Sequence, residues 1–585
     1  MTESPVRATM SRMTTPGYTT HEVTNQPPPL TGHDAFAADA ALREAVDREG
    51  AGWAADDLSA LGRLAGDPAW IARGVRAETN RPVLRTHDRY GHRIDEVEYD
   101  PAWHELMDVA VRHGLHGGPW ADKRPGAHVA RAAGQLVWGQ VDPGICCPVT
   151  MTYASVAALR LQPDVAAVWE PLITTTAYDP GLRPIAEKAG VLLGMGMTEK
   201  QGGSDVRAGT TVAVPQDGGG PGSAYTLTGH KWFCSAPMCD AFLVLAQTPA
   251  GVSCFLLPRV LPDGSRNAFA IQRLKDKLGN RSNASSEIEL QGTTGYLLGE
   301  EGRGVPLIAN MVNLTRLDCV LGTATLMRQA VAQAVHHARH RRAFGALLAD
   351  QPLMTAVLAD LAVESEAATA LAIRLAGAVD RTEQAGTGSD GAATAPDPHE
   401  AALRRLGTAV GKYWVCKRGP ATVAEALECL GGNGYVEDSG MPRLYREAPL
   451  NSIWEGSGNV NVLDVLRAIG RDPAAAEEFL AEVDAARGGD ARLDAAATAL
   501  REELRGIPAA LADGGAGVQR GARGLVERMA LALQGSLLVR HAPAEVADLF
   551  CATRLGGGGW AFGTQPDGVP ASGAAAIVAR HATPV

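Results

Sequence analysis

The spacing of apolar residues changes twice along the chain, from helical to strand-like and back to helical. This order of patterns constrains the fold more than any single motif. Between residues 34 and 184, apolar residues recur at helical spacing with only short breaks. Residues 191–298 instead form short apolar runs separated by Gly, Pro and Asn, a pattern typical of strands. Helical spacing returns over 304–345, and two more long helices are expected at 352–379 and 400–430. We therefore expect an α+β protein in which a β domain lies between two helical lobes.

The length of the chain, 585 residues, is too great for one ordinary core, so several domains are expected. We divide it into an N-terminal extension (1–30), an N-terminal helical domain (31–190), a middle β domain (191–300), a C-terminal helical bundle (301–470) and an additional C-terminal helical region (471–585). Residues 386–391 match a dinucleotide-binding fingerprint by letter. They follow no expected strand and open no βαβ unit, so we interpret the match as coincidence.

The composition argues against several classes of protein. Lys and Arg total 54 against 65 Asp and Glu, so the chain as a whole has no cationic surplus to attract nucleic acid. The nine cysteines are scattered, and the adjacent pair Cys146 and Cys147 has neither zinc-ligand nor disulfide-scaffold spacing, so no metal site is expected. No run approaches the roughly 18 to 20 apolar residues that a membrane span requires. Residues 1–26 lack the apolar segment of a signal peptide, and we expect a cytoplasmic location.

Two glycine-containing segments in the expected β domain are candidates for a ligand site. Residues 195–205 combine glycines, which let backbone N–H groups approach a ligand, with the hydroxyls of Thr198 and Ser204. An ordinary polar loop would have the same composition. Residues 229–235 place Trp232 among hydroxyl and thiol side chains, where its ring could stack on a flat ligand. A core tryptophan at the end of a strand is the alternative.

Two further candidate segments lie in the helical bundle. Residues 341–345, with Gln351, form a basic and aromatic cluster at the end of a helix. Such a cluster suits a pyrophosphate or, alternatively, the negative end of its own helix. Residues 430–459 contain a Gly-Gly pair and, later, Glu455 before Gly456. A carboxylate in that position is either a charge at a helix start or a general base in a pocket, and spacing alone does not choose between them.

Taken together, in this order and spacing, the four segments resemble the acyl-CoA dehydrogenase family over residues 194–467. The resemblance implies an N-terminal helical domain, a middle β-barrel domain and a C-terminal four-helix bundle. It also implies a homotetramer in which FAD lies between the domains and across a subunit interface. The residues implied to contact the flavin are Met197, Thr198, Ser204, Trp232 and Ser235 from the β domain, Arg341, Phe344 and Gln351 from a neighbouring subunit, and Leu430, Gly431, Gly432, Ser457 and Asn459.

A finer resemblance is to the AidB-type branch of that family, the adaptive-response flavoproteins linked to alkylation resistance, which carry extra sequence at both ends. The segments that carry it are 24–27, 48–53, 101–104, 147–152, 197–205, 275–284, 442–446 and 562–564. These segments extend from the first domain to the last, so the resemblance is not confined to one part of the chain.

Two departures from the family pattern bear on the site. A Gln usually lies three residues before the Gly-Gly pair, and here that residue is Glu428, which adds negative charge near the expected cofactor phosphates. In one subgroup the base precedes an arginine on a helix, but here Thr315 precedes Arg316, a residue expected in the substrate pocket. Glu455 is therefore the expected base, and Arg467 on the following helix is expected to orient it.

The resemblance implies an FAD-dependent oxidoreductase in which Glu455 takes the α proton of an acyl-CoA thioester and the flavin accepts the β hydride. The alternatives are an AidB-like, DNA-associated flavoprotein with weak or vestigial dehydrogenase activity, and a non-catalytic scaffold that keeps FAD for structural reasons. Residues 471–585 carry 11 Arg and no Lys against 14 acidic residues, so only weak duplex DNA binding is expected there. The arginines expected to contribute are Arg520, Arg523, Arg528 and Arg540.

Overall fold

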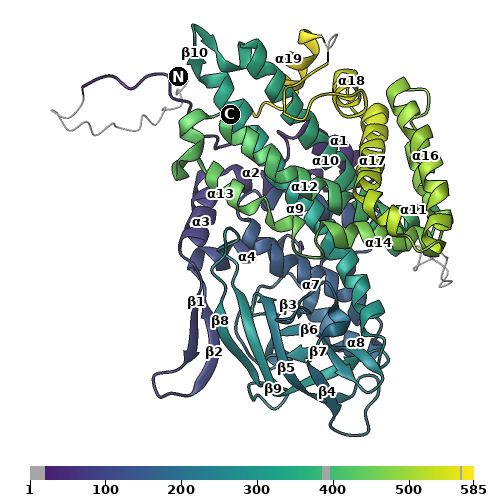
Figure 1. Ribbon diagram of the computed structural model, residues 1–585. Helices are drawn as coiled ribbons and strands as arrows, with labels where there is room; N and C mark the ends of the chain where they lie inside the picture. Colours follow the sequence, from purple (N-terminus) through teal and green to yellow (C-terminus); the bar gives the residue numbers. More distant parts are fainter. Residues whose placement is uncertain (1–19, 385–395, 567–569, 585) are drawn as a thin grey trace.

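A computed structural model describes residues 20–384, 396–566 and 570–584. Figure 1 shows a β domain at one end of the molecule, helices stacked on it, and the last helices packed along one side of that stack. The fingerprint-like segment 386–391 and most of residues 1–26 lie outside the described residues.

The N-terminal domain consists mainly of short helices whose starts are set by local capping. The Asp67 carboxylate accepts two backbone N–H groups of the first turn of α3, and Pro68 occupies the first helical position. At the start of α4, the Asp100 carboxylate accepts one backbone N–H group, that of Ala102, and Pro101 occupies the first helical position. The helices are α1 (Ala40–Arg48), α2 (Ala55–Gly66), α3 (Pro68–Thr79), α4 (Pro101–Arg112), α5 (Gly118–Ala121), α6 (Ala127–Trp138), α7 (Cys146–Leu159) and α8 (Pro163–Ile173).

A β-hairpin interrupts these helices where the sequence pattern indicated only short breaks. Strand β1 (Val83–His87) pairs antiparallel with β2 (Arg93–Glu98). At the tip, the Asp88 carboxylate accepts two backbone N–H groups, and Gly91 has a φ of +86°. The turn therefore depends on a side-chain hydrogen bond and on a left-handed glycine, which apolar periodicity does not reveal.

The middle domain is a β-barrel, as the resemblance implied. Its neighbouring strands run β6–β4–β5–β9–β7, and β7 pairs again with β6, so the sheet closes on itself. Closure leaves few free strand edges. Strand β3 adds to β6 and β8 adds to β9. The strands are β3 (Leu193–Gly196), β4 (Val212–Pro215), β5 (Ala224–Ser235), β6 (Ala241–Thr248), β7 (Gly251–Pro258), β8 (Phe269–Leu274) and β9 (Ser285–Leu298).

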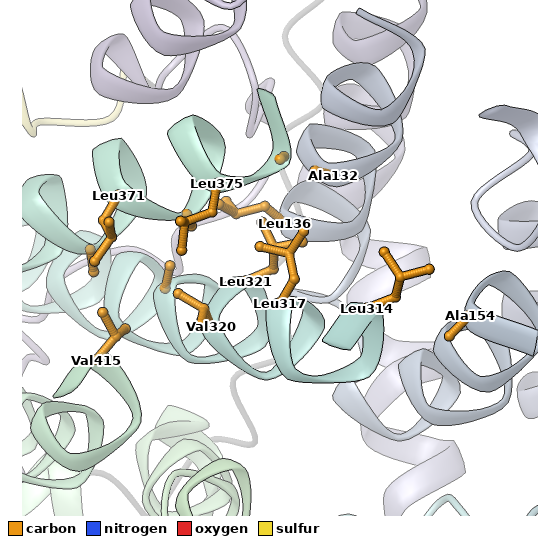
Figure 2. Close-up of a cluster of buried hydrophobic side chains, with 14 of the residues drawn as sticks. Ala132, Leu136, Ala154, Leu314, Leu317, Val320, Leu321, Leu371, Leu375 and Val415 are labelled. Carbon is orange, nitrogen blue, oxygen red and sulfur yellow. The ribbon is translucent and has the colours of Figure 1, made fainter. Parts of the chain in front are cut away.

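Helix α9 (Gly304–His340) lies at the centre of the C-terminal bundle because apolar residues occur on most of its faces. Figure 2 shows Leu317, Val320 and Leu321 of α9 packed among side chains of α6 and of two other bundle helices. No helix in the described ranges is long and apolar enough to cross a membrane. The other bundle helices are α10 (Pro352–Gln384), α11 (Pro398–Ala402), α12 (Thr408–Glu428), α13 (Met441–Glu447) and α14 (Gly458–Arg471).

The C-terminal region continues with helices that are tied to the bundle by ion pairs. Arg540 donates to the buried Glu482 carboxylate at 2.6 Å, and Arg374 of α10 donates to the same carboxylate at 3.0 Å. Helix α17 packs against α10, α12 and α14. The helices of this region are α15 (Ala474–Asp484), α16 (Ala491–Ala512), α17 (Ala516–His541), α18 (Ala544–Phe550) and α19 (Ala571–Arg580).

A buried ion pair joins the N-terminal domain to the bundle. Arg131 of α6 donates to both carboxylate oxygens of Asp318 in α9, at 2.5 and 2.7 Å, and to the Leu115 carbonyl at 2.8 Å. The Thr150 hydroxyl donates to the same carboxylate, and the guanidinium lies 3.9 Å from the centre of the Tyr153 ring. Each charge is fully partnered, so removing only one of them leaves the other buried and uncompensated.

We expect Asp318→Leu to lower the free energy of unfolding by about 3–5 kcal/mol, because the Arg131 guanidinium loses its counter-charge. The double variant that adds Arg131→Met should recover most of this loss. Arg73→Ala breaks the exposed pair between Arg73 and Glu105 and serves as control, with a cost of roughly 0–1 kcal/mol after solvent screening. Denaturant unfolding followed by circular dichroism measures all three, and equal losses for Asp318→Leu and Arg73→Ala would contradict this role of the pair.

Candidate active site

Glu455 lies on a loop between a short helical turn, η10 (Leu450–Ser452), and α14. The backbone of this loop is left-handed, with φ of +58° at Glu455 and +93° at Gly456. Such a value is costly for a glutamate, so surrounding contacts must hold it. The buried Lys412 Nζ of α12 donates to the carbonyls of Trp454 and Gly456 at 2.7 and 2.9 Å. Lys412 thereby fixes the loop on both sides of Glu455.

Helix α9 orients the Glu455 carboxylate. The Thr315 hydroxyl donates to Glu455 Oε2 at 2.5 Å, and Arg316 Nε donates to the Glu455 main-chain carbonyl at 3.0 Å. Burial raises the pKa of Glu455, while the Thr315 hydrogen bond and the charges of Lys412 and Arg316 act in the opposite direction. A half-buried carboxylate with a raised pKa is suited to accept a proton near neutral pH.

The structure does not bring Arg467 to Glu455, although we expected Arg467 to orient this carboxylate. Arg467 is exposed on α14, and within the described ranges no hydrogen bond or ion pair joins the two side chains. It lies about 14 Å along the axis from the start of α14, too far into the helix to reach back to the loop. Arg316 contacts Glu455 instead, and its guanidinium pairs with Asp464 at 2.7 Å.

The β domain contributes a second set of candidate residues. The main-chain N–H of Trp232 in β5 donates to the Thr198 carbonyl at 2.8 Å. The buried Glu199 carboxylate pairs with the buried Lys231 ammonium of β5 at 2.7 Å. These contacts fix the loop after β3 against β5. The expected flavin contacts on this loop, Met197, Thr198 and Ser204, are each at least partly exposed.

The Trp232 ring lies among cations, and its stacking on a flat ligand stays a prediction. The Lys275 ammonium lies 3.3 Å from the ring centre, and Lys200 and Arg273 lie at 5.8 and 5.7 Å. Lys275 therefore occupies one face of the ring in a cation–π contact. The next aromatic residue of β5, Phe233, is 51% exposed and was not identified from the sequence.

Residues from all three domains meet near Glu455. The buried Cys147 thiol of α7 lies against the Ser235 hydroxyl of β5. Burial raises the pKa of this thiol to about 11; the charge of Lys277 and the Ser235 hydroxyl lower it, and the Glu455 carboxylate raises it further. The Cys147 thiol thus joins α7 to β5 through Ser235, and the charge of Glu455 acts on the same thiol. The junction of the domains is the candidate active site.

The cluster expected to meet the ADP half of the cofactor lies elsewhere in the chain. It surrounds the short hairpin of β10 (Arg342–Ala343) and β11 (Ala346–Leu347), which Figure 1 places at the opposite end of the molecule from the barrel. Phe344 at its tip is 99% exposed. Arg341 donates to the Asn25 carbonyl at 2.5 Å, so the N-terminal extension holds this hairpin. Gln351 also supports it, through a hydrogen bond of 3.1 Å to a hairpin carbonyl.

Gly431 and Gly432 form an open cradle at the end of α12. Gly431 has a φ of +60°, and no atom lies within 4 Å of a Cβ built at either glycine. A phosphate can therefore approach the backbone N–H groups here, which fits the phosphate-binding role implied by the resemblance. Leu430 is buried beneath the cradle, and Ser457 and Asn459 are exposed at the start of α14.

The acidic residue that departs from the family pattern, Glu428, adds charge to the end of α12. Burial raises the pKa of Glu425, and the charges of Glu428 and Asp360 raise it further. Negative charge is therefore concentrated on the helix end that precedes the glycines. Among the described residues, no group of His, Cys, Asp and Glu is arranged to hold a metal ion.

Two residues that build the site were not identified as functional from the sequence. Lys412 lies in a helix, where lysine is ordinary, and only its place on a buried face distinguishes it. Cys147 begins one of the AidB-like segments, but scattered cysteines gave no reason to associate it with Ser235. Both act through contacts between distant segments.

The fold and the site together define the architecture of acyl-CoA dehydrogenases, and three family profiles match consecutive parts of the chain. Residues 25–180 match the adaptive response protein AidB N-terminal domain. Residues 194–293 match the acyl-CoA dehydrogenase middle domain, and residues 302–470 match the acyl-CoA dehydrogenase C-terminal domain.

Relatives of known sequence agree with these matches. The chain is 47% identical over 489 residues to the putative acyl-CoA dehydrogenase AidB of Escherichia coli K12, covering 83% of this chain and 87% of the relative. It is 33% identical over 427 residues to acyl-CoA dehydrogenase family member 11 of Caenorhabditis elegans, covering 71% and 66%. The crystal structure of C. elegans ACDH-11 in complex with C11-CoA matches with a TM-score of 0.80 at 27% identity, covering 92% of this chain and 94% of that one. The chain belongs to the acyl-CoA dehydrogenase family, in its AidB-type branch.

Proposed function

We propose that this protein is an FAD-dependent acyl-CoA dehydrogenase in which Glu455 removes the α proton of an acyl-CoA thioester. When bound, FAD accepts the β hydride of the substrate. The observation that carries the proposal is the setting of the Glu455 carboxylate, which is half-buried, has a raised pKa and accepts a hydrogen bond from Thr315. The relationship to AidB, and the acyl-CoA named for the C. elegans structure, support this class of substrate.

The Glu455 backbone supplies a second group that the reaction needs. Lys412 donates to the carbonyls on either side of Glu455. The main-chain N–H of Glu455, by contrast, has no acceptor within the described part of the chain. It is therefore free to donate to the thioester oxygen, where negative charge develops as the proton leaves. One residue would thus provide both the base and an oxyanion donor.

The proposed FAD site needs more than one copy of the chain. The β-domain residues would face the flavin ring, and Gly431, Gly432 and the β10–β11 hairpin would face the ADP half. Because the hairpin and the barrel lie at opposite ends of one chain (Figure 1), we infer that a second copy supplies the hairpin. The full exposure of Phe344 and the 87% exposure of Leu353 support such an interface. A homotetramer is part of this proposal.

The protein should purify with tightly bound, non-covalent FAD, and acyl-CoA should bleach its flavin absorbance under anaerobic conditions. Glu455→Gln should retain FAD but lose this bleaching, because the amide keeps the shape of the side chain and cannot accept the proton. Glu105→Gln, a change on an exposed face of α4, should behave as wild type. Purification with FMN or without flavin, or unchanged reduction rates in Glu455→Gln, would falsify the proposal.

The pH dependence of flavin reduction should report Glu455. Because the base must be ionised, the rate should rise with pH through the pKa of Glu455. Thr315→Val removes the hydroxyl that stabilises the carboxylate, so the midpoint of this rise should move to higher pH, whereas Thr315→Ser should leave it in place. Stopped-flow rates measured across pH test this. A midpoint that stays or falls in Thr315→Val would show that the hydroxyl does not act on the base.

A second candidate function is weak binding of duplex DNA, and unpaired cations near the active-site loop favour it. Lys417 Nζ and Arg523 Nη2 both approach Gly458, within 3.2 and 3.4 Å of a Cβ built there. Neither forms an ion pair within the described ranges. Of the four arginines expected to contact DNA, Arg520 and Arg523 are exposed, whereas Arg528 and Arg540 pair with Glu503 and Glu482.

We therefore expect sequence-independent duplex binding that weakens steeply as salt approaches physiological strength, because each phosphate contact releases counterions. Arg520→Glu combined with Arg523→Glu should abolish it. Arg528→Ala should change it little, since Arg528 is already paired. Fluorescence anisotropy across a salt series measures the binding. Tight binding that survives salt, or weak binding unaffected by the double change, would rule out this surface.

A further inference from the structure

A chain of hydrogen bonds leads from the loop between β8 and β9 to the candidate active site. Lys277 Nζ donates to Ser285 Oγ at 3.0 Å, and Ser285 Oγ lies 3.2 Å from Ser235 Oγ. Ser235 is partly exposed and lies at the junction that also contains Cys147 and Glu455. The proposed reaction assigns no role to Lys277 or Ser285.

The charge on Lys277 favours one direction of the hydrogen bonds in this chain. An ammonium group has donors only, so Ser285 must accept a hydrogen bond from Lys277. Among the described residues, the other hydrogen-bond partner of the buried Ser285 Oγ is Ser235 Oγ, so the Ser285 proton is directed to Ser235. The Ser235 proton is then left to face Cys147 and the site. An apolar side chain at position 277 leaves Ser285 Oγ without this donor, so donation from Ser235 to Ser285 becomes more favourable.

The surroundings of Lys277 hold it in this position. Its Nζ also donates to the Asn283 carbonyl at 2.7 Å and lies 3.4 Å from Asn280 Oδ1. Asn280 Nδ2 in turn donates to the buried Glu447 carboxylate at 2.9 Å. Burial lowers the pKa of Lys277, and nearby acidic groups oppose that shift: Cys147, Glu447, Glu78 and Asp142. All three ammonium protons therefore have an acceptor.

The acidic groups come from separate parts of the fold. Glu447 belongs to α13, Glu78 to α3, and Asp142 to the segment before α7. The Glu78 carboxylate accepts backbone N–H groups of the β8–β9 loop, and the Asp142 carboxylate accepts the hydroxyl of Ser282 on the same loop. The loop that carries Lys277 is thus anchored on several sides, which keeps the hydrogen bonds from Lys277 through Ser285 to Ser235 in place.

We propose that Lys277 is a positioning residue that keeps the Ser235 hydroxyl donating toward a bound flavin and so favours flavin reduction. This inference rests on the proposed function, because it requires FAD beside Ser235. Two-electron reduction adds negative charge to a flavin, and a fixed donor stabilises that charge. Lys277 acts through the order of two hydroxyl groups and needs no contact with flavin or substrate.

The test is the two-electron midpoint potential of FAD in the holoprotein, measured anaerobically against reference dyes. Lys277→Met and Ser285→Ala should each disfavour reduction about tenfold, or about 30 mV for a two-electron couple. Lys277→Arg keeps a donor-only cation and should retain the wild-type potential. Lys123→Met removes the same charge from an exposed loop and should also leave the potential unchanged.

The outcomes separate this inference from the function on which it rests. A wild-type protein that holds no FAD refutes the proposed function before any variant is compared. If FAD binds, equal potentials in wild type, Lys277→Met and Ser285→Ala overturn the role of Lys277. A shift in Lys277→Met without one in Ser285→Ala also overturns it, because the hydroxyl chain is then not the route. Should Lys277→Met fail to fold, Ser285→Ala, which removes one hydroxyl and keeps the charge, decides the question alone.

Discussion

One turn of α9 supports both the domain junction and the candidate base. Asp318 binds Arg131 of the N-terminal domain, and Thr315, three residues earlier, donates to the Glu455 carboxylate. Residues three apart on a helix lie on neighbouring turns of one face, so the two contacts share a rigid support. Arg316 adds a contact to the Glu455 backbone. Because α9 is packed along most of its length, any shift of this turn would disturb the domain interface and the base together.

Two buried lysines show how the fold separates a proton acceptor from a structural carboxylate. Lys231 pairs directly with Glu199, and although burial raises the pKa of Glu199, this hydrogen bond and others from the backbone hold it well below its usual range. Lys412 instead donates to the carbonyls on either side of Glu455. Its charge stays close without a direct ion pair, so burial prevails and the pKa of Glu455 is raised. Only the arrangement at Lys412 leaves a carboxylate with a raised pKa, which can act as a base.

The sequence predicted the features that depend on local composition. The β domain between helical domains, and the glycine-containing segments that border the site, follow from runs and spacings within short stretches, whereas the barrel was implied by the family resemblance. Contacts between distant segments did not follow from it: Thr315 and Glu455 are 140 residues apart in sequence. Helical spacing put Arg467 on α14 but did not show which way its side chain points. Thr315 contacts the Glu455 carboxylate instead, and Arg316 contacts the Glu455 main-chain carbonyl. The β1–β2 hairpin was missed because its turn depends on the Asp88 side chain.

Internal pairing in the C-terminal region uses several of its arginines within the fold. Arg554 pairs with Asp360 and Glu364 of α10, and Arg580 pairs with Glu366, so arginines that composition alone would count toward DNA binding are used within the fold. The exposed remainder includes Arg523, which faces the start of α14 just beyond Glu455. We infer that an anion held there would lie on the loop that carries the base. If an anion at this position changed the affinity for acyl-CoA, linkage would require acyl-CoA to change the affinity for that anion by the same factor.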